Sequence, residues 1–162
     1  MTSTGAIGLP ALEAQLAREL DLVGFVRPEW VRPRDYDGER VLDVAVIGGG
    51  QCGLATAFGL RREGVANVLV FDENAAGFEG PWETYARMVT LRTPKHLNPI
   101  DFGIPSLTYQ AWWQAQHGLA GWEAVDKIAR GDWMDYLRWY RAVLALPVEN
   151  GAKLTRIEPL PQ

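Results

Sequence analysis

The chain has 162 residues, 48% of them hydrophobic and 10% aromatic, which is enough to bury one modest core without metal or disulfide staples. Its 16 Lys and Arg against 20 Asp and Glu give a net charge of -4 without a basic run, so no nucleic-acid partner is expected. No apolar run approaches the roughly 20 residues that cross a bilayer, and the first residues lack a secretory-signal pattern. We therefore expect a globular, cytoplasmic protein that does not bind membranes.

Side chains that bind metals or form disulfides are sparse. Cys52 is the single cysteine, so no internal disulfide or dithiol pair can form, which argues against a thiol-disulfide flavoenzyme. Its place at a helix start would stabilise a thiolate, but a small packing residue under the phosphates is the favoured interpretation. His96 and His117 have no neighbours at metal-ligand spacing, and no metal site is expected.

The N-terminal segment predicts a helix and a connector. Within residues 10–23, Leu12, Leu16 and Leu20 form one helical stripe, typical of a helix packed on a domain surface. Residues 25–40 are rich in Pro, Arg and Asp without a clean period and predict a loop or extended connector.

The organised domain is predicted at residues 41–162, after an N-terminal part of residues 1–40. It begins with a strand (41–48), a helix (52–64) and a second strand (67–72). Both strands are almost continuous runs of Val and Ile, as buried parallel strands are. The fold class is therefore α/β: a Rossmann-like domain with a parallel sheet, helices and a right-handed crossover.

The rest of the chain predicts a loop, two helices and a strand. Residues 73–107 are irregular, and a stretch of this length inside a domain is uncommon unless it is functional, so it is expected to line a ligand. Helices are predicted at 107–118 and 131–146, and a last strand at 152–160. The residues expected on one buried face of the second helix are Trp133, Leu137, Tyr140 and Leu144.

The turn after the first strand carries the pattern Gly48-x-Gly50-x-x-Gly53. Gly48 allows a tight turn, Gly50 lets the backbone approach a pyrophosphate, and Gly53 lets the helix pack closely on the strand. Gln51 and Cys52 stand at the start of the helix, whose dipole and free N–H groups would meet the pyrophosphate. With its flanking elements, the pattern predicts a dinucleotide site.

An acidic residue closes the second strand, where a ribose hydroxyl would find its acceptor. The alternation of Val68, Val70 and Asp72 favours Asp72 for this contact, while Glu73 competes for it and is expected in solvent. An acid here disfavours a 2′-phosphate, which leaves FAD or NAD as the cofactor.

With these motifs in place, residues 41–159 resemble the N-terminal part of a flavin-dependent monooxygenase, of the group of flavin-containing, Baeyer–Villiger and N-hydroxylating monooxygenases. In that family the first glycine fingerprint belongs to FAD, and the acid after the second strand binds the adenosine ribose. The matching positions are Gly48, Gly50, Gly53 and Asp72.

Three further segments carry the resemblance. The family's G-G-x-W turn beside the flavin ring is matched by "EGPW", which keeps Gly80 and Trp82 and replaces the first glycine with Glu79. Core packing is the alternative role for Trp82. On the segment that passes the adenine, the position of Leu154 implies a backbone contact to the cofactor.

The segment "LRTPK" resembles the family segment that crosses the flavin site. Arg92 stands where flavin-containing monooxygenases commonly have an asparagine near the reactive edge of the flavin. Its planar fork suits a cofactor phosphate or a carboxylate substrate, and a surface salt bridge is the alternative. Lys95 matches a family lysine, with a solvated charge as the alternative.

The resemblance implies an enzyme in which NADPH reduces FAD and a C4a-(hydro)peroxyflavin oxygenates a small organic substrate. The flavin carries that chemistry while the protein orients it and excludes water, so no catalytic residue is nominated. No second glycine fingerprint follows residue 64, and the NADPH site is expected outside this chain. We therefore expect an incomplete domain whose unfinished edge is open to association.

Two other functions remain open. The same fingerprint serves NAD in dehydrogenases, although "EGPW" and "LRTPK" argue against that class. A non-catalytic nucleotide-binding module would bind a dinucleotide without accepting electrons from NADPH.

Replacing Gly50 with Val is expected to abolish dinucleotide binding, because the side chain would fill the space that the pyrophosphate needs. Equilibrium binding of the dinucleotide to wild type and Gly50→Val measures the effect. Retained binding would contradict the interpretation of the glycine pattern.

Overall fold

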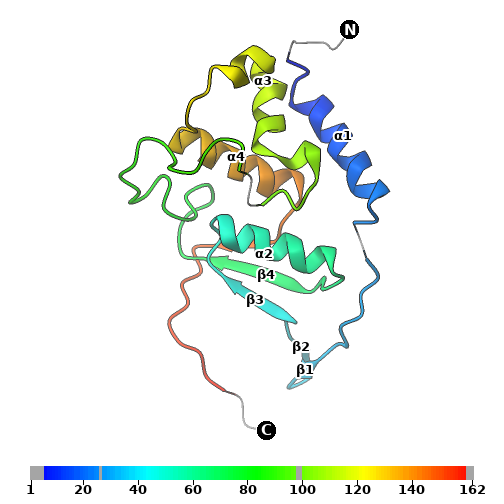
Figure 1. Ribbon diagram of the computed structural model, residues 1–162. Coiled ribbons are helices and arrows are strands. Elements are labelled where there is room, and N and C mark those ends of the chain that lie inside the picture. Colours follow the sequence, from blue (N-terminus) through cyan, green and yellow to red (C-terminus); the bar gives the residue numbers. More distant parts are fainter. Residues whose placement is uncertain (1–5, 26, 98–99, 160–162) are drawn as a thin grey trace.

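A computed structural model describes residues 6–25, 27–97 and 100–159. Figure 1 shows the helices gathered on one side of a small sheet, with α2 lying along the sheet and the C-terminal segment running away from it. The strands are β1 (Asp35–Tyr36), β2 (Glu39–Arg40), β3 (Val44–Ile47), β4 (Val68–Asp72) and β5 (Val148–Asn150). The helices are α1 (Leu9–Leu22), α2 (Gln51–Arg62), the short 3-10 helix η1 (Pro105–Leu107), α3 (Tyr109–Glu123) and α4 (Arg130–Val143).

The predicted strand–helix–strand unit is confirmed. Strands β3 and β4 pair in parallel with Val44 opposite Val68, and α2 connects them. Strand β5 pairs in parallel with the other edge of β4, with Val148 opposite Val70, so the order in the sheet is β3-β4-β5. The sheet is therefore parallel, as the α/β class requires, and β1 with β2 forms a separate antiparallel pair.

The two strands of the unit differ in burial. Val68, Val70 and Asp72 point into the interior from β4, as their alternation predicts. Strand β3 is only half-buried, with Ile47 52% exposed, so the expectation of a fully buried strand is wrong for it. The reason is its position: among the described strands β3 pairs with β4 alone, and its other edge is open.

The last strand lies earlier than predicted. Strand β5 spans Val148–Asn150, and no strand is found at residues 152–159; residue 160 lies outside the described part. Gly151 has a φ of 72°, a left-handed conformation that interrupts the extended backbone. After it, Ala152 N still donates to Asp72 O at 2.9 Å before the chain leaves the sheet.

Helix α4 supplies the centre of the core, as predicted. The four residues expected on its buried face, with the last just beyond the helix, are all buried: Trp133, Leu137, Tyr140 and Leu144. Burial raises the pKa values of Tyr136 and Tyr140, which keeps both hydroxyls protonated as donors. Tyr136 Oη donates to Leu107 O at 2.7 Å and Tyr140 Oη donates to Ile100 O at 2.9 Å, which holds the irregular segment against α4.

Helix α1 shares this core. Leu12 and Leu16 are almost fully buried within the same hydrophobic cluster as the side chains of α4 and the sheet. The Glu19 carboxylate accepts hydrogen bonds from the backbone N (3.0 Å) and Oγ (2.8 Å) of Ser106. Trp139 Nε1 donates to Glu13 Oε1 at 3.0 Å. The helix is thus fixed by packing and by hydrogen bonds, and the division of the chain at residue 41 stays a prediction.

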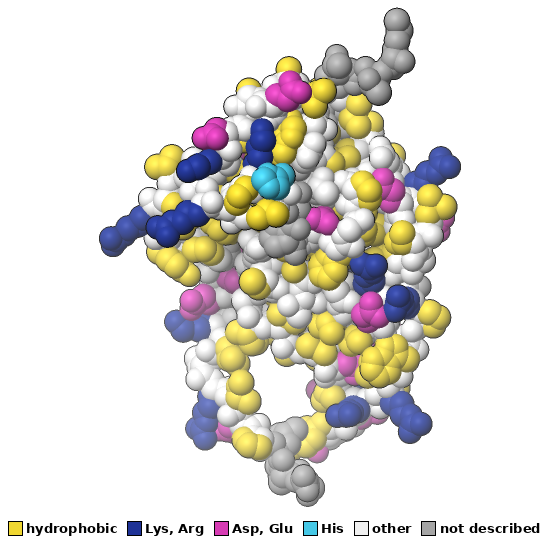
Figure 2. All heavy atoms as spheres, in the orientation of Figure 1, with side chains coloured by type: hydrophobic (Ala, Val, Ile, Leu, Met, Phe, Trp, Pro, Cys, Tyr) yellow, Lys and Arg dark blue, Asp and Glu magenta, His cyan; other side chains and the backbone are white. Residues whose placement is uncertain are grey.

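The face of the molecule drawn in Figure 2 is of mixed charge. On the face shown in Figure 2, Lys and Arg side chains are interspersed with Asp and Glu and form no continuous basic stripe. Within the described residues, no helix is both long and apolar enough to cross a bilayer.

Leu16→Ala is expected to lower the free energy of unfolding by about 2–5 kcal/mol, because it leaves a cavity where α1 meets the core. The matched control is Leu22→Ala in the same helix, whose side chain is 73% exposed and whose loss should change stability by less than about 0.5 kcal/mol. Urea unfolding of both variants gives the comparison, and equal losses would contradict the packing of α1 in the core.

Candidate functional site

The glycine turn joins β3 to α2. Gly48 has a φ of 97°, which a residue with a side chain adopts only under strain. A Cβ on Gly53 would lie 1.7 Å from Gly48 O, so the third glycine is required for the helix to begin this close to the strand. These two glycines have the local roles that their spacing predicts.

Gly50 is favoured for a reason that the pattern alone does not reveal. A Cβ at this position would lie 3.2 Å from Gly80 Cα. Gly80 itself has a φ of 74°. The irregular segment therefore passes directly over the glycine turn, backbone against backbone, and a side chain at position 50 would push the two apart.

A cleft of about 770 Å³ opens beside this turn, at the carboxyl ends of β3 and β4. Ligands of open parallel sheets bind at this end of the strands. Most of the predicted cofactor residues line it: Gly48, Gly50, Gln51, Cys52, Gly53, Asp72, Glu73, Gly80, Trp82 and Leu154. The N-terminus of α2 faces the cleft with free backbone N–H groups. Cys52 is exposed there and lines the cleft.

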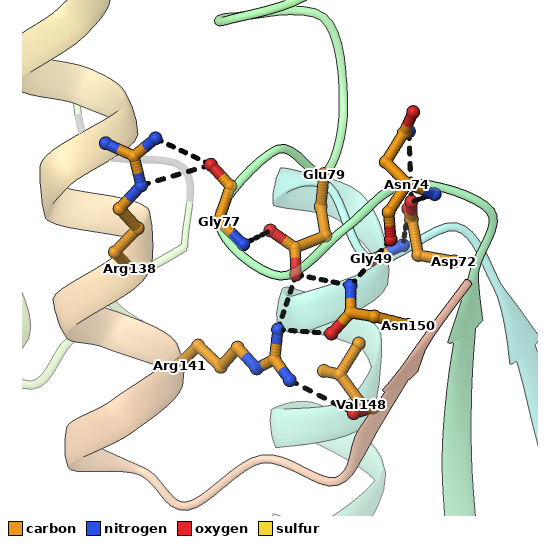
Figure 3. A network of polar contacts seen from close by, with 9 residues as sticks. All are labelled: Gly49, Asp72, Asn74, Gly77, Glu79, Arg138, Arg141, Val148 and Asn150. Atoms are coloured by element: carbon orange, nitrogen blue, oxygen red, sulfur yellow. Dashed lines mark hydrogen bonds and ion pairs between the residues drawn. The ribbon is translucent and has the colours of Figure 1, made fainter. Parts of the chain in front are cut away.

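Asp72 braces the turn from the end of β4, as Figure 3 shows. It is 5% exposed. Its Oδ2 accepts from Gly49 N at 2.7 Å, and its Oδ1 accepts from Asn74 N (2.8 Å) and Asn74 Nδ2 (3.0 Å). A carboxylate has about four acceptor positions, so Oδ2 retains capacity for a hydroxyl donor.

Glu73 occupies the rim of the cleft. It is exposed and pairs with Lys153 Nζ at 2.9 Å, in agreement with its expected place in solvent. Leu154 lies two residues after Ala152 and is 46% exposed. It reaches the cleft from an irregular segment and not from the strand on which it was expected.

Glu79 is the centre of a buried polar network (Figure 3). This residue is only 4% exposed, although it is charged. Its carboxylate forms an ion pair with Arg141, accepts from Asn150 Nδ2 at 2.7 Å, and accepts from Gly77 N at 2.9 Å. Arg141 in turn donates to Val148 O at 3.0 Å and to Asn150 Oδ1 at 2.9 Å.

This Glu79 network joins three parts of the chain: the segment that carries Gly80, helix α4 and strand β5. Arg138 adds a second link from α4, with Nε and Nη2 donating to Gly77 O at 3.1 and 2.6 Å. In the sequence Glu79 was visible only as a departure from a G-G-x-W turn. Its partner Arg141 was missed, because nothing in a local pattern connects residues 62 positions apart.

Arg92 and Lys95 lie outside the cleft. Arg92 lines a neighbouring pocket of about 210 Å³, which meets the cleft at Gln51 and Trp82 because both residues line both spaces. Lys95 lines neither space: its Nζ donates to Trp122 O at 2.8 Å and lies 4.6 Å from the centroid of the Trp122 ring. This lysine caps the end of α3, so its charge serves the fold and is not directed to a cofactor.

The region described in the structure contains no cluster of His, Cys, Asp and Glu that could hold a metal ion. The site is therefore built from glycines, backbone N–H groups and two acids, which suits a dinucleotide phosphate and ribose.

Comparison with known proteins identifies the family. Residues 45–159 match the family described as FAD-NAD(P)-binding. The chain belongs to this family. The match confirms the predicted dinucleotide-binding class of the domain.

This FAD-NAD(P)-binding chain is also similar to an FAD-dependent urate hydroxylase of Xanthomonas campestris pv. campestris, at 58% identity over 153 residues. The aligned region covers 94% of the chain but 32% of the relative, so the chain spans about a third of the length of the curated relative it matches. No solved structure matches the chain.

Glu79→Ala is expected to lower the free energy of unfolding by about 3 kcal/mol, because it leaves Arg141 largely buried without its counter-ion. The control is Glu73→Ala, which removes an exposed pair and should cost less than about 1 kcal/mol. Removing Arg141 as well should cost less than the sum of the two single changes. Additive losses in thermal or urea unfolding would show that the two side chains do not act together.

Proposed function

We propose that this chain is the FAD-binding part of an FAD-dependent hydroxylase that oxygenates a small organic molecule with NAD(P)H as electron donor. The observation that carries the proposal is the 58% identity, over 94% of the chain, to a protein named as an FAD-dependent urate hydroxylase. Urate, or a planar molecule of the same kind, is accordingly the proposed substrate.

The cleft has the form that FAD requires. Its volume of about 770 Å³ lies within the usual range of about 300–1,000 Å³ for small-molecule sites. The glycine turn leads directly into α2, and its N-cap residue Gly50 forms no side-chain cap hydrogen bond, so a pyrophosphate would accept the backbone N–H donors there. A Cβ on Gly50 would disturb this approach and also displace Gly80.

Different residues of the cleft are proposed to contact different parts of FAD. Asp72 would accept from the adenosine ribose, and its negative charge disfavours the 2′-phosphate of NADP at this position. The backbone at Leu154 would contact the adenine, while Gly80 and Trp82 would lie toward the flavin ring. When bound, FAD supplies the electron transfer and oxygen chemistry; the chain binds it, orients it and excludes water.

The NAD(P)H site is expected in a part of the protein beyond this chain, since the chain spans about a third of its relative. The open edge of β3 is the proposed place of association with that part or with another chain. We propose action in the cytoplasm, where NAD(P)H is available, without nucleic-acid or membrane partners.

Titration of FAD into the chain, followed by quenching of flavin fluorescence, tests the proposal. We expect saturable one-to-one binding, no competition by NAD, and a weakening by about 1–3 kcal/mol in Asp72→Ala through the lost ribose contact. Glu73→Gln is the control and should bind FAD as wild type does.

Three results would change the interpretation. Preference for NAD over FAD would replace the proposal with the NAD-binding domain of a dehydrogenase. If the longest natural form of the protein binds FAD but NAD(P)H does not reduce that FAD, a non-catalytic nucleotide-binding module is favoured. If Glu73→Gln weakens FAD and Asp72→Ala does not, the ribose contact belongs to Glu73. Thermal unfolding of each variant separates these effects from misfolding, because Asp72 also braces Gly49.

A further inference from the structure

The pocket that contains Arg92 has a composition different from that of the cleft. This Arg92 pocket has a volume of about 210 Å³ and is lined mainly by apolar and aromatic side chains. The residues that matter most are Gln51, Trp82, Leu91, Arg92, Ile128 and Trp133. Leu91 and Ile128 are almost fully buried, and the rings of Trp82 and Trp133 meet edge to face at 74° with centroids 6.5 Å apart. Such walls favour a flat, apolar body.

Among the described residues that line this pocket, Arg92 is the charged one. Among the described residues its guanidinium has no hydrogen-bond or ion-pair partner. The other arginines beside the cleft differ in this respect, since Arg138 and Arg141 are held by Gly77 and Glu79. Arg92 is exposed, so its guanidinium lies at the solvent side of the pocket and is available for a ligand. Its planar group matches an anion with two acceptors in one plane.

Gln51 offers a second polar contact in the same space. Its Oε1 accepts from Trp133 Nε1 at 3.2 Å, which orients the amide and leaves its nitrogen as a donor. A heterocycle in the pocket could thus meet a charged donor at Arg92, a neutral donor at Gln51 and an aromatic wall at Trp82. Few donors in a mostly apolar pocket fix the orientation of a small ligand.

The Arg92 pocket adjoins the cleft, because two residues line both spaces. Gln51 and Trp82 line both spaces, whereas Asp72 and Leu154 line the cleft alone. A ligand beside Arg92 therefore adjoins the end of the cleft that is marked by Trp82, and not the end where the ribose and adenine contacts are proposed.

We propose that the Arg92 pocket binds a planar heterocyclic anion through the Arg92 guanidinium. This inference rests on the proposed function and names the ligand class of the same site. Two ligands have this chemistry: an anionic substrate such as urate, and the flavin ring itself, which gains negative charge on reduction. The experiment has one arm for each.

The variants are Arg92→Gln, which removes the charge, and Arg92→Lys, which keeps the charge but loses the fork. Arg87→Gln is the matched control: Arg87 is an exposed arginine of the same segment that lines neither space, and its loss changes the net charge by the same amount. Thermal unfolding of each variant confirms that it is folded.

The first arm measures urate binding to the chain by equilibrium dialysis, with and without FAD. Hypoxanthine, a purine of similar outline that is uncharged at neutral pH, is the comparison ligand. If a substrate anion occupies the pocket, Arg92→Gln should weaken urate by about tenfold and Arg92→Lys by less, because a charge-assisted hydrogen bond is lost. Hypoxanthine binding and the Arg87→Gln control should not change.

The second arm measures the reduction potential of FAD bound to each variant. If the flavin ring occupies the pocket, loss of the positive charge should disfavour the reduced form, and a tenfold loss corresponds to a potential about 30 mV lower for a two-electron couple. A change in urate binding or in the FAD potential that is seen in the Arg92 variants and not in Arg87→Gln supports the inference. The arm in which the change appears identifies the ligand.

No response in either arm, with all variants folded, overturns the inference. Failure of the proposed function is separate: a chain that binds no FAD contradicts that proposal, while urate dialysis without FAD still decides the role of Arg92.

Discussion

The buried ion pair of Glu79 and Arg141 is the constraint on which the site depends. Removing two charges from water is costly, and such a pair is stable only where hydrogen bonds satisfy the remaining polar atoms. Here Asn150, Gly77 and the Val148 carbonyl supply them. These partners come from an irregular segment, helix α4 and strand β5. The ion pair therefore forms only when these three parts of the chain are arranged as they are here. That arrangement fixes the path of the chain beside the glycine turn.

The cleft follows from this fixed path. The segment held by Glu79 brings Gly80 against Gly50, so closely that a Cβ on either glycine would lie 3.2–3.3 Å from the Cα of the other. Asp72 holds the opposite side of the turn through Gly49 N. The free N–H groups of α2 therefore lie between two fixed segments, one at Gly80 and one at Gly49. A binding site that is already in place lowers the conformational free-energy cost of ligand binding. A glycine at position 79, as in the monooxygenase pattern, could not form this network.

The charges near the two spaces are distributed unevenly. Asp72 and Glu73 lie at the carboxyl end of β4, where the proposed ribose contact falls, whereas Arg92 lines the apolar pocket beside Trp82. Opposite charges at the two ends would orient a long, polar cofactor and a small anion relative to one another. In the proposed function, this separation gives each end a different recognition chemistry.

The sequence by itself determined the strand–helix–strand unit, the roles of Gly48 and Gly53, and the inward direction of Asp72, because each depends on neighbours within a few residues or on the period of one element. The tertiary structure decided what joins distant segments. It paired Glu79 with Arg141, brought Gly80 to Gly50, assigned Lys95 to the carbonyls of α3, and left β3 half-exposed. Such contacts depend on how the packed elements meet, and no local spacing encodes that geometry.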